Sequence, residues 1–339
     1  MRPTTSRRDL LAAAALAAAP AFAQAPSAAM EEVLDYARAQ KTTGFLVVRD
    51  RRTLVERNWP APEADAARFR ASYAYETTPE GALLEDVASQ QKSFVAILAA
   101  IAVDKGLLDV ERPVSDYIGP GWSKAAPEQE RAIRVIHLLT MCSGLGEPLN
   151  YLAPAGSTFF YNTPAYAILK PVLAAVAGQP LETITRDWLT QPAGMRNTGW
   201  RPRPAAFAGV GNPTGLVTSP RDVAIMGQVV LDGGRAADGR RIVSEAGMKA
   251  MLSRSPANPA YGRLWWLNGG AYTVRPAGRA EGPLIPAAPA DLVAALGALD
   301  RKLYVVPSRR LIVVRMGLAA PDRDFDQQLW LRLARALAI

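Results

Sequence analysis

Ser89 and Lys92 stand three positions apart in the sequence, and residues at that spacing share one face of a helix. A serine hydroxyl becomes a good nucleophile only when a neighbouring base takes its proton. A lysine amine can be that base where burial or nearby positive charge lowers its pKa. The residues that follow are strongly apolar: Phe94, Val95, Ile97, Leu98 and Ile101. The pattern predicts a buried helix with a Ser–Lys pair at its start, although a capping serine beside a solvated lysine also fits the motif taken alone.

Two later segments carry groups that such a pair could use. Tyr161 lies in a turn-rich loop over residues 154–166, and a phenol can relay a proton between an amine and a leaving group. Gly297 lies in a predicted strand, where a glycine often marks the close approach of a ligand or another backbone. A backbone N–H there could stabilise an oxyanion. Each residue alone also fits a packing role.

The composition leaves few other combinations of catalytic residues. The 339 residues include one histidine, His137, and one cysteine, Cys142. A Ser–His–Asp hydrolase would have to use His137, but no Gly-x-Ser-x-Gly elbow is present, and we interpret His137 as structural. Cys142 is interpreted as a packed free thiol rather than a nucleophile. We expect no metal site and no cofactor, because a zinc site usually needs about four ligands, mostly sulfur and imidazole.

The elements that must position these residues change in type along the chain. Helical patterns dominate from about 89 to 252, and residues 58–80 are predicted as a loop. Apolar runs bounded by turn residues predict strands at both ends of the chain: 44–48, 53–57, 292–298, 302–306 and 311–315. Amphipathic helices are predicted over 28–40 and 324–337, and a further helix should begin near Ser219.

This order of elements predicts an α+β fold class. The simplest assembly is one antiparallel sheet built from N- and C-terminal strands and flanked by the terminal helices, with a mostly helical region inserted in the middle. We place the sheet parts at about 28–80 and 290–339, and the helical part at about 81–289.

Residues 1–25 have the features of an export signal. Arg7 and Arg8 precede an alanine- and leucine-rich run from 10 to 19, and small residues follow at the spacing of an A-x-A cleavage site. The pattern is typical of a twin-arginine signal cleaved after Ala23 or Ala25. The run is too short to span a bilayer. We therefore expect a periplasmic or secreted protein with no stable membrane span.

The formal net charge is +8, which favours solubility and weak attraction to anionic surfaces. The arginines are spread along the chain, and no basic stripe is interleaved with aromatic residues. We therefore expect no nucleic-acid partner, and no obligate protein partner is evident.

Several segments, taken together and in order, resemble the serine β-lactamase-like family, which includes class C β-lactamases, D,D-peptidases, esterases and 6-aminohexanoate-oligomer hydrolases. The segments that carry the resemblance are 86–93, 106–114, 137–145, 156–166, 191–199 and 303–307. The resemblance implies one catalytic domain over 26–339, with Ser89 as the acylated nucleophile, Lys92 as its base and Tyr161 as a proton relay.

The resemblance also implies an oxyanion hole made by the N–H groups of Ser89 and Ala298, with Gly297 and Asn162 at the substrate. Two departures bear on specificity. The family's tyrosine motif is often Tyr-x-Asn, whereas here Asn162 directly follows the tyrosine and Thr163 holds the third place. Its third motif is often Lys-Thr-Gly or His-x-Gly, whereas here residues 295–297 read Ala-Leu-Gly.

Without that cation and hydroxyl, a carboxylate of the penicillin type loses its usual partners. The resemblance therefore implies an exported serine hydrolase that acts on small-molecule esters or amides. The alternatives are β-lactamase or D,D-peptidase activity, and a non-catalytic cell-wall-binding module of the same fold.

Overall fold

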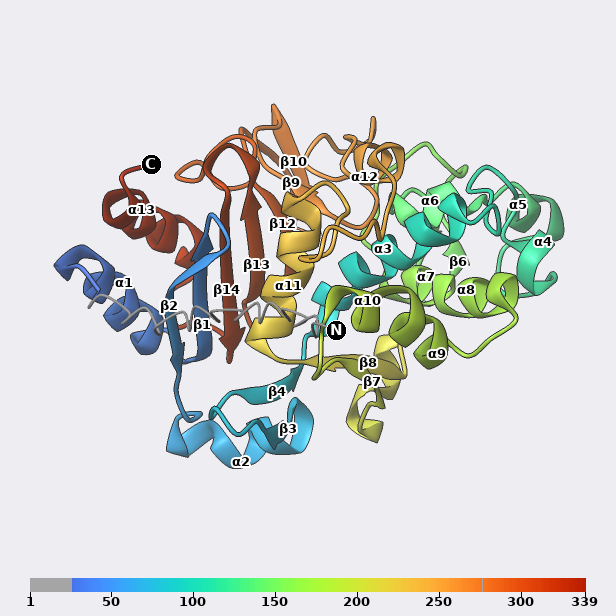
Figure 1. The fold of residues 1–339 in the computed structure, drawn as a ribbon. Helices are drawn as coiled ribbons and strands as arrows, with labels where there is room; N and C mark the ends of the chain where they lie inside the picture. The colour runs from blue at the N-terminus through green and yellow to red at the C-terminus, as the bar shows by residue number, and fades with distance from the viewer. Residues whose placement is uncertain (1–25, 276) are drawn as a thin grey trace, which may run out of the picture.

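A computed structural model of the protein describes residues 26–275 and 277–339. The predicted signal, residues 1–25, lies outside the described residues. A sheet with helices on both faces forms one half of the molecule, and a mainly helical region forms the other (Figure 1).

The central sheet has six strands in the order β2-β1-β14-β13-β12-β9, and neighbouring strands are antiparallel. Its strands are β1 (Thr42–Arg49), β2 (Arg52–Asn58), β9 (Trp266–Leu267), β12 (Val293–Gly297), β13 (Arg301–Val306) and β14 (Leu311–Gly317). Strand β1 pairs directly with β14, with Phe45 opposite Arg315. The predicted sheet of strands from both ends of the chain is confirmed.

Helices cover both faces of this sheet. On one face α1 (Ala28–Ala39) packs against α13 (Phe325–Leu337), and on the other lies α11 (Pro220–Leu231) (Figure 1). The Ser219 hydroxyl accepts from the N–H of Asp222 and caps α11, as the sequence predicts. The two terminal helices were also predicted from their amphipathic patterns.

The helical region surrounds α3, which is buried from Gln91 to Ala102, as expected for a helix that is apolar on all sides. The remaining helices are α4 (Ser115–Ile118), α5 (Pro127–Arg131), α6 (Val135–Leu139), α7 (Thr163–Ala167), α8 (Leu169–Ala177), α9 (Leu181–Thr185), α10 (Gln191–Ala193) and α12 (Glu245–Met251), with α3 itself at Gln91–Asp104.

Short elements complete this region and the turns of the sheet. They are the strand pairs β5 (Leu145–Gly146) with β6 (Asn150–Tyr151) and β10 (Tyr272–Arg275) with β11 (Gly278–Glu281), and the single turns η1 (Ala88–Gln90), η2 (Arg186–Thr190), η3 (Ala205–Val210) and η4 (Pro307–Arg309).

The prediction of a loop over residues 58–80 is wrong in part. The segment contains α2 (Glu63–Ser72) and β3 (Ala74–Thr77). Strand β3 belongs to a second sheet, with the order β3-β4-β8-β7, whose other strands are β4 (Leu83–Asp86), β7 (Gly199–Pro202) and β8 (Thr214–Thr218). Helix α2 buries only Phe69, and β8, which pairs with β4 on its other side, comes from distant sequence. Neither feature leaves a local periodicity, so the sequence pattern could not reveal this sheet.

Helix α13 offers a matched test of the packing on the sheet. Leu329 is fully buried at 0% exposure, whereas Leu331 in the same helix is 44% exposed. Leu329→Ala should lower the free energy of unfolding by about 2–5 kcal/mol, because it leaves a cavity in the core. Leu331→Ala should change it by less than about 0.5 kcal/mol. Urea unfolding followed by circular dichroism measures both, and equal losses would contradict this packing.

Candidate active site

Ser89 lies in the short turn η1, which joins β4 to α3. The residue before it, Ala88, has a φ of 48°, a left-handed conformation that costs a non-glycine residue about 1–3 kcal/mol. The N–H of Ala88 donates to Asp86 Oδ1 at 2.8 Å, and the N–H of Val87 donates to the carbonyl of Leu216 at 3.0 Å. The second sheet thus holds the strained turn, and Ser89 stays partly exposed between buried neighbours.

Lys92 lies one helical turn beyond Ser89 and is 2% exposed. Its Nζ donates to Ser89 Oγ at 2.9 Å and to Thr163 Oγ1 at 3.2 Å. Burial and, to a smaller extent, the Arg203 cation lower the pKa of Lys92 from 10.5 to about 7, against the opposing effect of Glu147. An amine that is neutral in about half of the molecules at pH 7 and is hydrogen-bonded to a serine hydroxyl can act as a general base.

Tyr161 borders this pair. Lys92 Nζ lies 4.8 Å from the centroid of the Tyr161 ring. Burial raises the pKa of Tyr161 to about 12, and a hydrogen bond with Ser89 reduces the rise. The ring stacks on Trp266 with centroids 5.9 Å apart, and Tyr261 packs edge-on against both rings. The phenol is therefore protonated at neutral pH, and aromatic packing fixes it beside the Ser89 hydroxyl.

Strand β12 brings Gly297 against the turn that carries Ser89. A Cβ atom on Gly297 would lie only 2.3 Å from the carbonyl oxygen of Val87 and 3.3 Å from the N atom of Gln90. Only glycine permits this approach. The Gln90 side chain donates to the carbonyl of Ala295 at 3.3 Å, which ties the turn to the same strand. The predicted close approach at Gly297 is thus an approach of two backbones.

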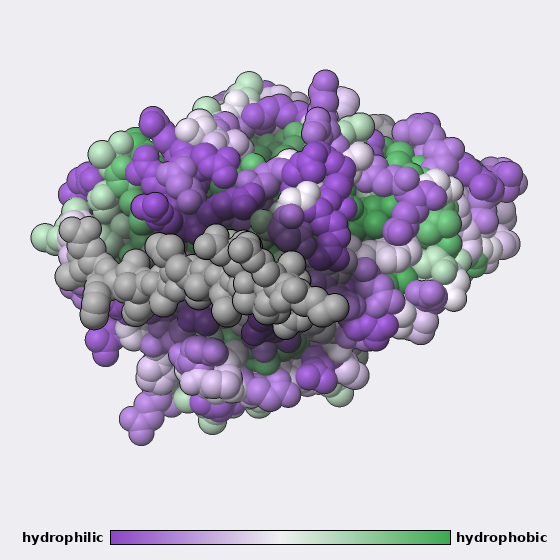
Figure 2. Space-filling view, viewed as in Figure 1, coloured by the Kyte–Doolittle hydropathy of each residue, from purple (hydrophilic) through white to green (hydrophobic). Residues whose placement is uncertain are grey.

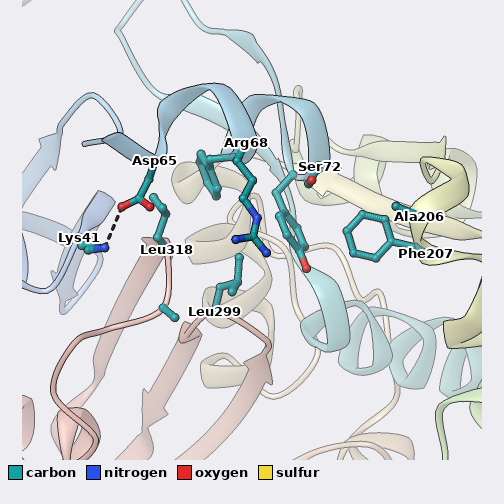
Figure 3. Close-up of a pocket in the computed structure, with 11 residues that line it drawn as sticks. Lys41, Asp65, Arg68, Ser72, Ala206, Phe207, Leu299 and Leu318 are labelled. Atoms are coloured by element: carbon teal, nitrogen blue, oxygen red, sulfur yellow. Dashed lines mark hydrogen bonds and ion pairs between the residues drawn. The ribbon is translucent and has the colours of Figure 1, made fainter. Parts of the chain in front are cut away.

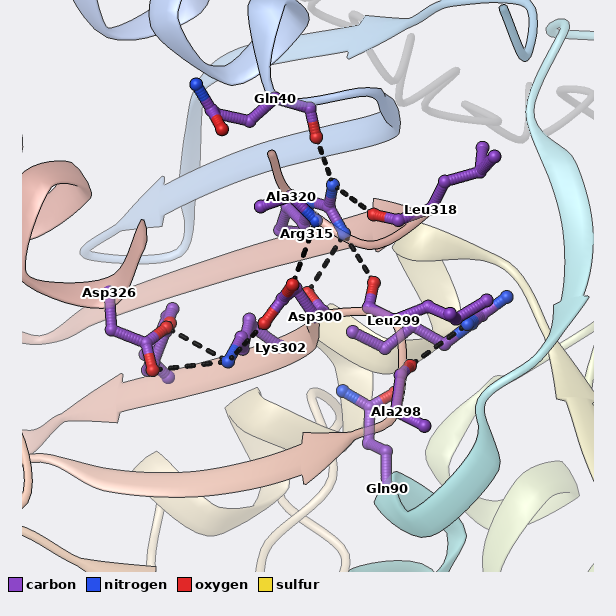
Figure 4. A network of polar contacts seen from close by, with 12 residues as sticks. Gln40, Gln90, Ala298, Leu299, Asp300, Lys302, Arg315, Leu318, Ala320 and Asp326 are labelled. Atoms are coloured by element: carbon purple, nitrogen blue, oxygen red, sulfur yellow. Dashed lines mark hydrogen bonds and ion pairs between the residues drawn. The ribbon is translucent and has the colours of Figure 1, made fainter. Parts of the chain in front are cut away.

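Ala298 directly follows β12 and is exposed. Figure 4 shows the contacts that hold the tip of the β12–β13 hairpin. Arg315 donates to the carbonyls of Leu299 and Asp300 at 2.7 and 3.1 Å, and Arg301 donates to the carbonyl of Ala298 at 3.0 Å. Buried guanidinium groups therefore fix the segment that presents Ala298.

Asn162 is buried and its amide is engaged by the loop itself, and its assignment to substrate binding stays a prediction. Its side chain is 0% exposed. Nδ2 donates to the carbonyl of Leu145 at 2.8 Å, and Oδ1 accepts from the N–H of Ala165 at 2.9 Å. The amide is therefore engaged in holding the loop and capping α7.

Thr163 belongs to the site, because its hydroxyl accepts a hydrogen bond from Lys92. No role was assigned to it from the sequence alone. Its position two residues after Tyr161, where the resemblance leads one to expect an asparagine, was the available signal.

His137 and Cys142 have structural surroundings. Nδ1 of the buried His137 accepts from the N–H of Arg134 at 3.1 Å. Burial lowers the pKa of His137, and the Arg134 charge lowers it further. Cys142 is buried, and burial raises the pKa of its thiol, which disfavours the reactive thiolate.

A cavity of about 500 Å³ lies beside the hairpin tip (Figure 3). Its apolar walls are Phe69, Tyr73, Phe207, Leu299 and Leu318. The ion pair between Lys41 and Asp65, 2.7 Å long, lies at one end. Ser89, Lys92 and Tyr161 are not among the lining residues.

Across residues 26–275 and 277–339, no cluster of three or more His, Cys, Asp or Glu side chains could hold a metal ion. In the same part of the chain, no helix is long and apolar enough to cross a membrane. The face seen in Figure 2 is largely polar, with apolar areas between the polar side chains, notably over the helical region.

Among curated proteins, no sequence matches this chain significantly. Solved structures of similar fold include a family VIII carboxylesterase, with a TM-score of 0.64 at 16% identity, covering 92% of this chain and 97% of that one. A class C β-lactamase from Rhodobacter sphaeroides gives a TM-score of 0.62 at 15% identity, covering 92% and 99%. EstCE1, a hydrolase with promiscuous acyltransferase activity, gives 0.62 at 17% identity, covering 91% and 96%.

At these identities the likeness shows the fold alone. The sequence itself supplies the family, because the Beta-lactamase family model matches residues 23–336. The Ser–Lys pair, the tyrosine beside it and the strand against the nucleophile turn all lie within that match. The chain therefore belongs to the beta-lactamase family of serine hydrolases.

Proposed function

We propose that this chain hydrolyses small esters or amides through an acyl-enzyme on Ser89. The observation that carries the proposal is the 2.9 Å hydrogen bond between Lys92 Nζ and Ser89 Oγ, made by a lysine whose pKa burial lowers to about 7. A base whose pKa lies near the working pH combines a large unprotonated fraction with a useful driving force for proton transfer.

In acylation, Ser89 Oγ attacks the substrate carbonyl carbon while its proton moves to Lys92 Nζ. The N–H groups of Ser89 and Ala298 are assigned to the oxyanion that develops. The tetrahedral intermediate then collapses, and the bond to the leaving group breaks. Tyr161 donates its phenol proton to the leaving alcohol or amine and takes the proton held by Lys92. The step leaves an ester on Ser89 and a neutral lysine.

Deacylation repeats these steps with water as the nucleophile. A water molecule attacks the acyl carbon and gives a proton to the Lys92–Tyr161 pair, and that proton returns to Ser89 Oγ as the acid leaves. Both half-reactions use one base, which must be unprotonated before each attack. The low proton affinity of Lys92 serves both.

The residues around the proposed substrate site favour esters and uncharged amides. Residues 295–297 lack the cation and hydroxyl that would hold a substrate carboxylate. The nearby Lys302 cannot substitute, because its ammonium is paired with Asp300 at 3.2 Å and Asp326 at 3.0 Å. Glu147, which acts on Lys92 electrostatically, would repel an anionic substrate. β-Lactam turnover remains the alternative that the fold of the class C neighbour suggests, and these features count against it.

We propose in addition that the protein is exported. The support is the twin-arginine pattern of Arg7 and Arg8 followed by the apolar run over 10–19. Export in folded form would suit a chain with a single cysteine, which needs no oxidation to fold.

A fluorophosphonate probe should form one adduct, located on the Ser89 peptide by mass spectrometry. Ser89→Ala should abolish the adduct and the hydrolysis of short-chain p-nitrophenyl esters. Ser93→Ala is the matched control, because Ser93 lies one turn further on and donates to the carbonyl of Leu264. It should retain labelling. Adducts on another residue, or none on folded wild type, would refute the proposal, whereas faster turnover of a chromogenic cephalosporin than of any ester would favour the alternative.

Lys92→Met should abolish labelling and yet raise the melting temperature at pH 7. The unfolded chain keeps this lysine protonated up to about pH 10.4, whereas the folded protein holds the proton only below about pH 7. Between these values the unfolded state binds more protons, so the stability of the wild type rises with pH. The advantage of Lys92→Met should therefore shrink between pH 7 and 9.5.

Thermal melts at the two pH values measure this difference. Lys249→Met serves as the control, because Lys249 is exposed on α12 and its replacement should give no such pH dependence. A constant advantage of Lys92→Met would contradict a neutral Lys92.

Export is tested by expressing the full chain in a bacterium with a twin-arginine pathway. The expected product is periplasmic, with its N-terminus after Ala23 or Ala25. Replacing Arg7 and Arg8 by lysine should retain the uncleaved protein in the cytoplasm, because the pathway reads the arginine pair. Periplasmic recovery of the doubly substituted protein would exclude this route.

A further inference from the structure

A buried ion pair lies directly behind the nucleophile turn. Arg203 donates through Nε to Asp86 Oδ2 at 2.7 Å and through Nη2 to Asp86 Oδ1 at 3.0 Å. The side chains are 8% and 2% exposed. Asp86 Oδ1 also accepts the N–H of Ala88, the strained residue before Ser89. One carboxylate therefore connects the guanidinium to the turn.

The second sheet is shaped to hold this carboxylate. A Cβ atom on Gly215 of β8 would lie 2.1 Å from Asp86 Oδ2, so the absence of a side chain there makes room for the ion pair. Arg203 follows β7 and is held in place by its own backbone, whose N–H donates to the carbonyl of Pro213 at 2.9 Å. The pair is thus fixed from β4, β7 and β8 together.

Lys170 adds a third basic group, at 7% exposure. Its Nζ donates to Asn212 Oδ1 at 2.6 Å and to the carbonyl and hydroxyl of Thr214 at 2.8 and 2.9 Å. These acceptors are all uncharged. Burial, together with the Arg203 charge, lowers the pKa of Lys170 to about 6. Lys170 and Lys92 face the same ring, that of Tyr166, with Nζ at 5.7 and 4.8 Å from its centroid.

Three basic side chains therefore surround one aromatic ring, and Asp86 is the carboxylate that pairs with one of them. Asp86 is engaged by Arg203, a group that stays protonated in proteins. Both lysines are left without a salt bridge in the described part of the chain. A buried amine with no counter-ion loses its proton rather than bear the cost of desolvation.

We propose that Asp86 and Arg203 form a positioning pair for the Ser89–Lys92 couple, an inference that rests on the proposed hydrolase function. Asp86 holds the turn that presents Ser89. Arg203 sets a permanent cation behind Lys92 and pairs with the Asp86 carboxylate, so that the amine stays free to take the serine proton. Neither side chain touches the substrate.

The charges around Lys92 fix the sign of the effect. Arg203 and Lys170 favour the neutral amine, Glu147 favours the ammonium, and the phenols of Tyr161 and Tyr166 are uncharged at neutral pH. Loss of the Arg203 charge would leave the carboxylates of Asp86 and Glu147 without an opposing guanidinium and favour the ammonium. Loss of the Asp86 charge would leave the cation unbalanced and favour the neutral amine still more.

The test is the rate of Ser89 phosphonylation by an uncharged fluorophosphonate between pH 5 and 10. In the wild type this rate should fall below the pKa of Lys92, about 7, as the amine becomes protonated. We call this fall at low pH the acid limb. Arg203→Gln should move this limb up by about one pH unit and recover rate in alkali. Asp86→Asn should move it down, and Arg203→Lys, which keeps the cation, should leave it in place. Asp86→Asn combined with Arg203→Gln should return the limb to near the wild-type position.

A matched control breaks another buried ion pair. Asp326→Asn removes the partner of Lys302, 3.0 Å away between α13 and β13, and should lower the melting temperature without moving the acid limb. A pair that only stabilises the fold would behave like this control, with the rate lowered equally at every pH.

Limbs that stay at the wild-type pH in Arg203→Gln and Asp86→Asn would overturn the inference. If Arg203→Gln does not fold, as judged by circular dichroism, the sign of the Asp86→Asn shift decides alone. If wild type is never labelled at Ser89 at any pH, the hydrolase proposal itself fails, and the two failures are thereby distinguished.

Discussion

The buried amine of Lys92 is the constraint on which the rest of the active site depends. It lies against Ser89 at 2.9 Å with a hydroxyl and aromatic rings around it, and no carboxylate of the described residues forms a salt bridge with it. A carboxylate within reach would hold the lysine as an ammonium and leave the serine without a base. Asp86, the carboxylate behind the nucleophile turn, is itself engaged twice, by Arg203 and by the backbone of that turn.

Geometry around the nucleophile follows from two sheets that meet at one turn. The second sheet supplies Asp86 and holds the turn by backbone hydrogen bonds. The central sheet supplies Gly297, whose missing side chain lets β12 lie against the same turn. Because each sheet fixes one side, the strained conformation at Ala88 persists. The helical region contributes Tyr161 and Thr163 from a loop that the Asn162 amide pins internally.

The sequence predicted those features that depend on local hydrophobic periodicity or on motifs in a fixed order. The terminal helices, the strands of the central sheet and the Ser–Lys spacing all have such signals. The second sheet has none, because β4 and β8 are far apart in sequence and α2 buries only Phe69. The exchange of roles between Asn162 and Thr163 depends on which side chain points inward, and adjacent residues in a loop give no periodicity to decide that. The Arg203–Asp86 pair joins residues 117 positions apart, and no local pattern links them.

The pairing of β1 with β14 has a consequence for how the molecule is made. Phe45 lies opposite Arg315 in the ladder, so the first strand has no partner along that edge until nearly the whole chain has left the ribosome. At synthesis rates of about 5–20 residues per second, that wait is on the order of tens of seconds. Contacts of such large sequence separation also slow the search for the native state. The N-terminal hairpin must therefore stay soluble with an open edge, and catalytic competence arises late, since β12 and its hairpin tip emerge with the same final segment.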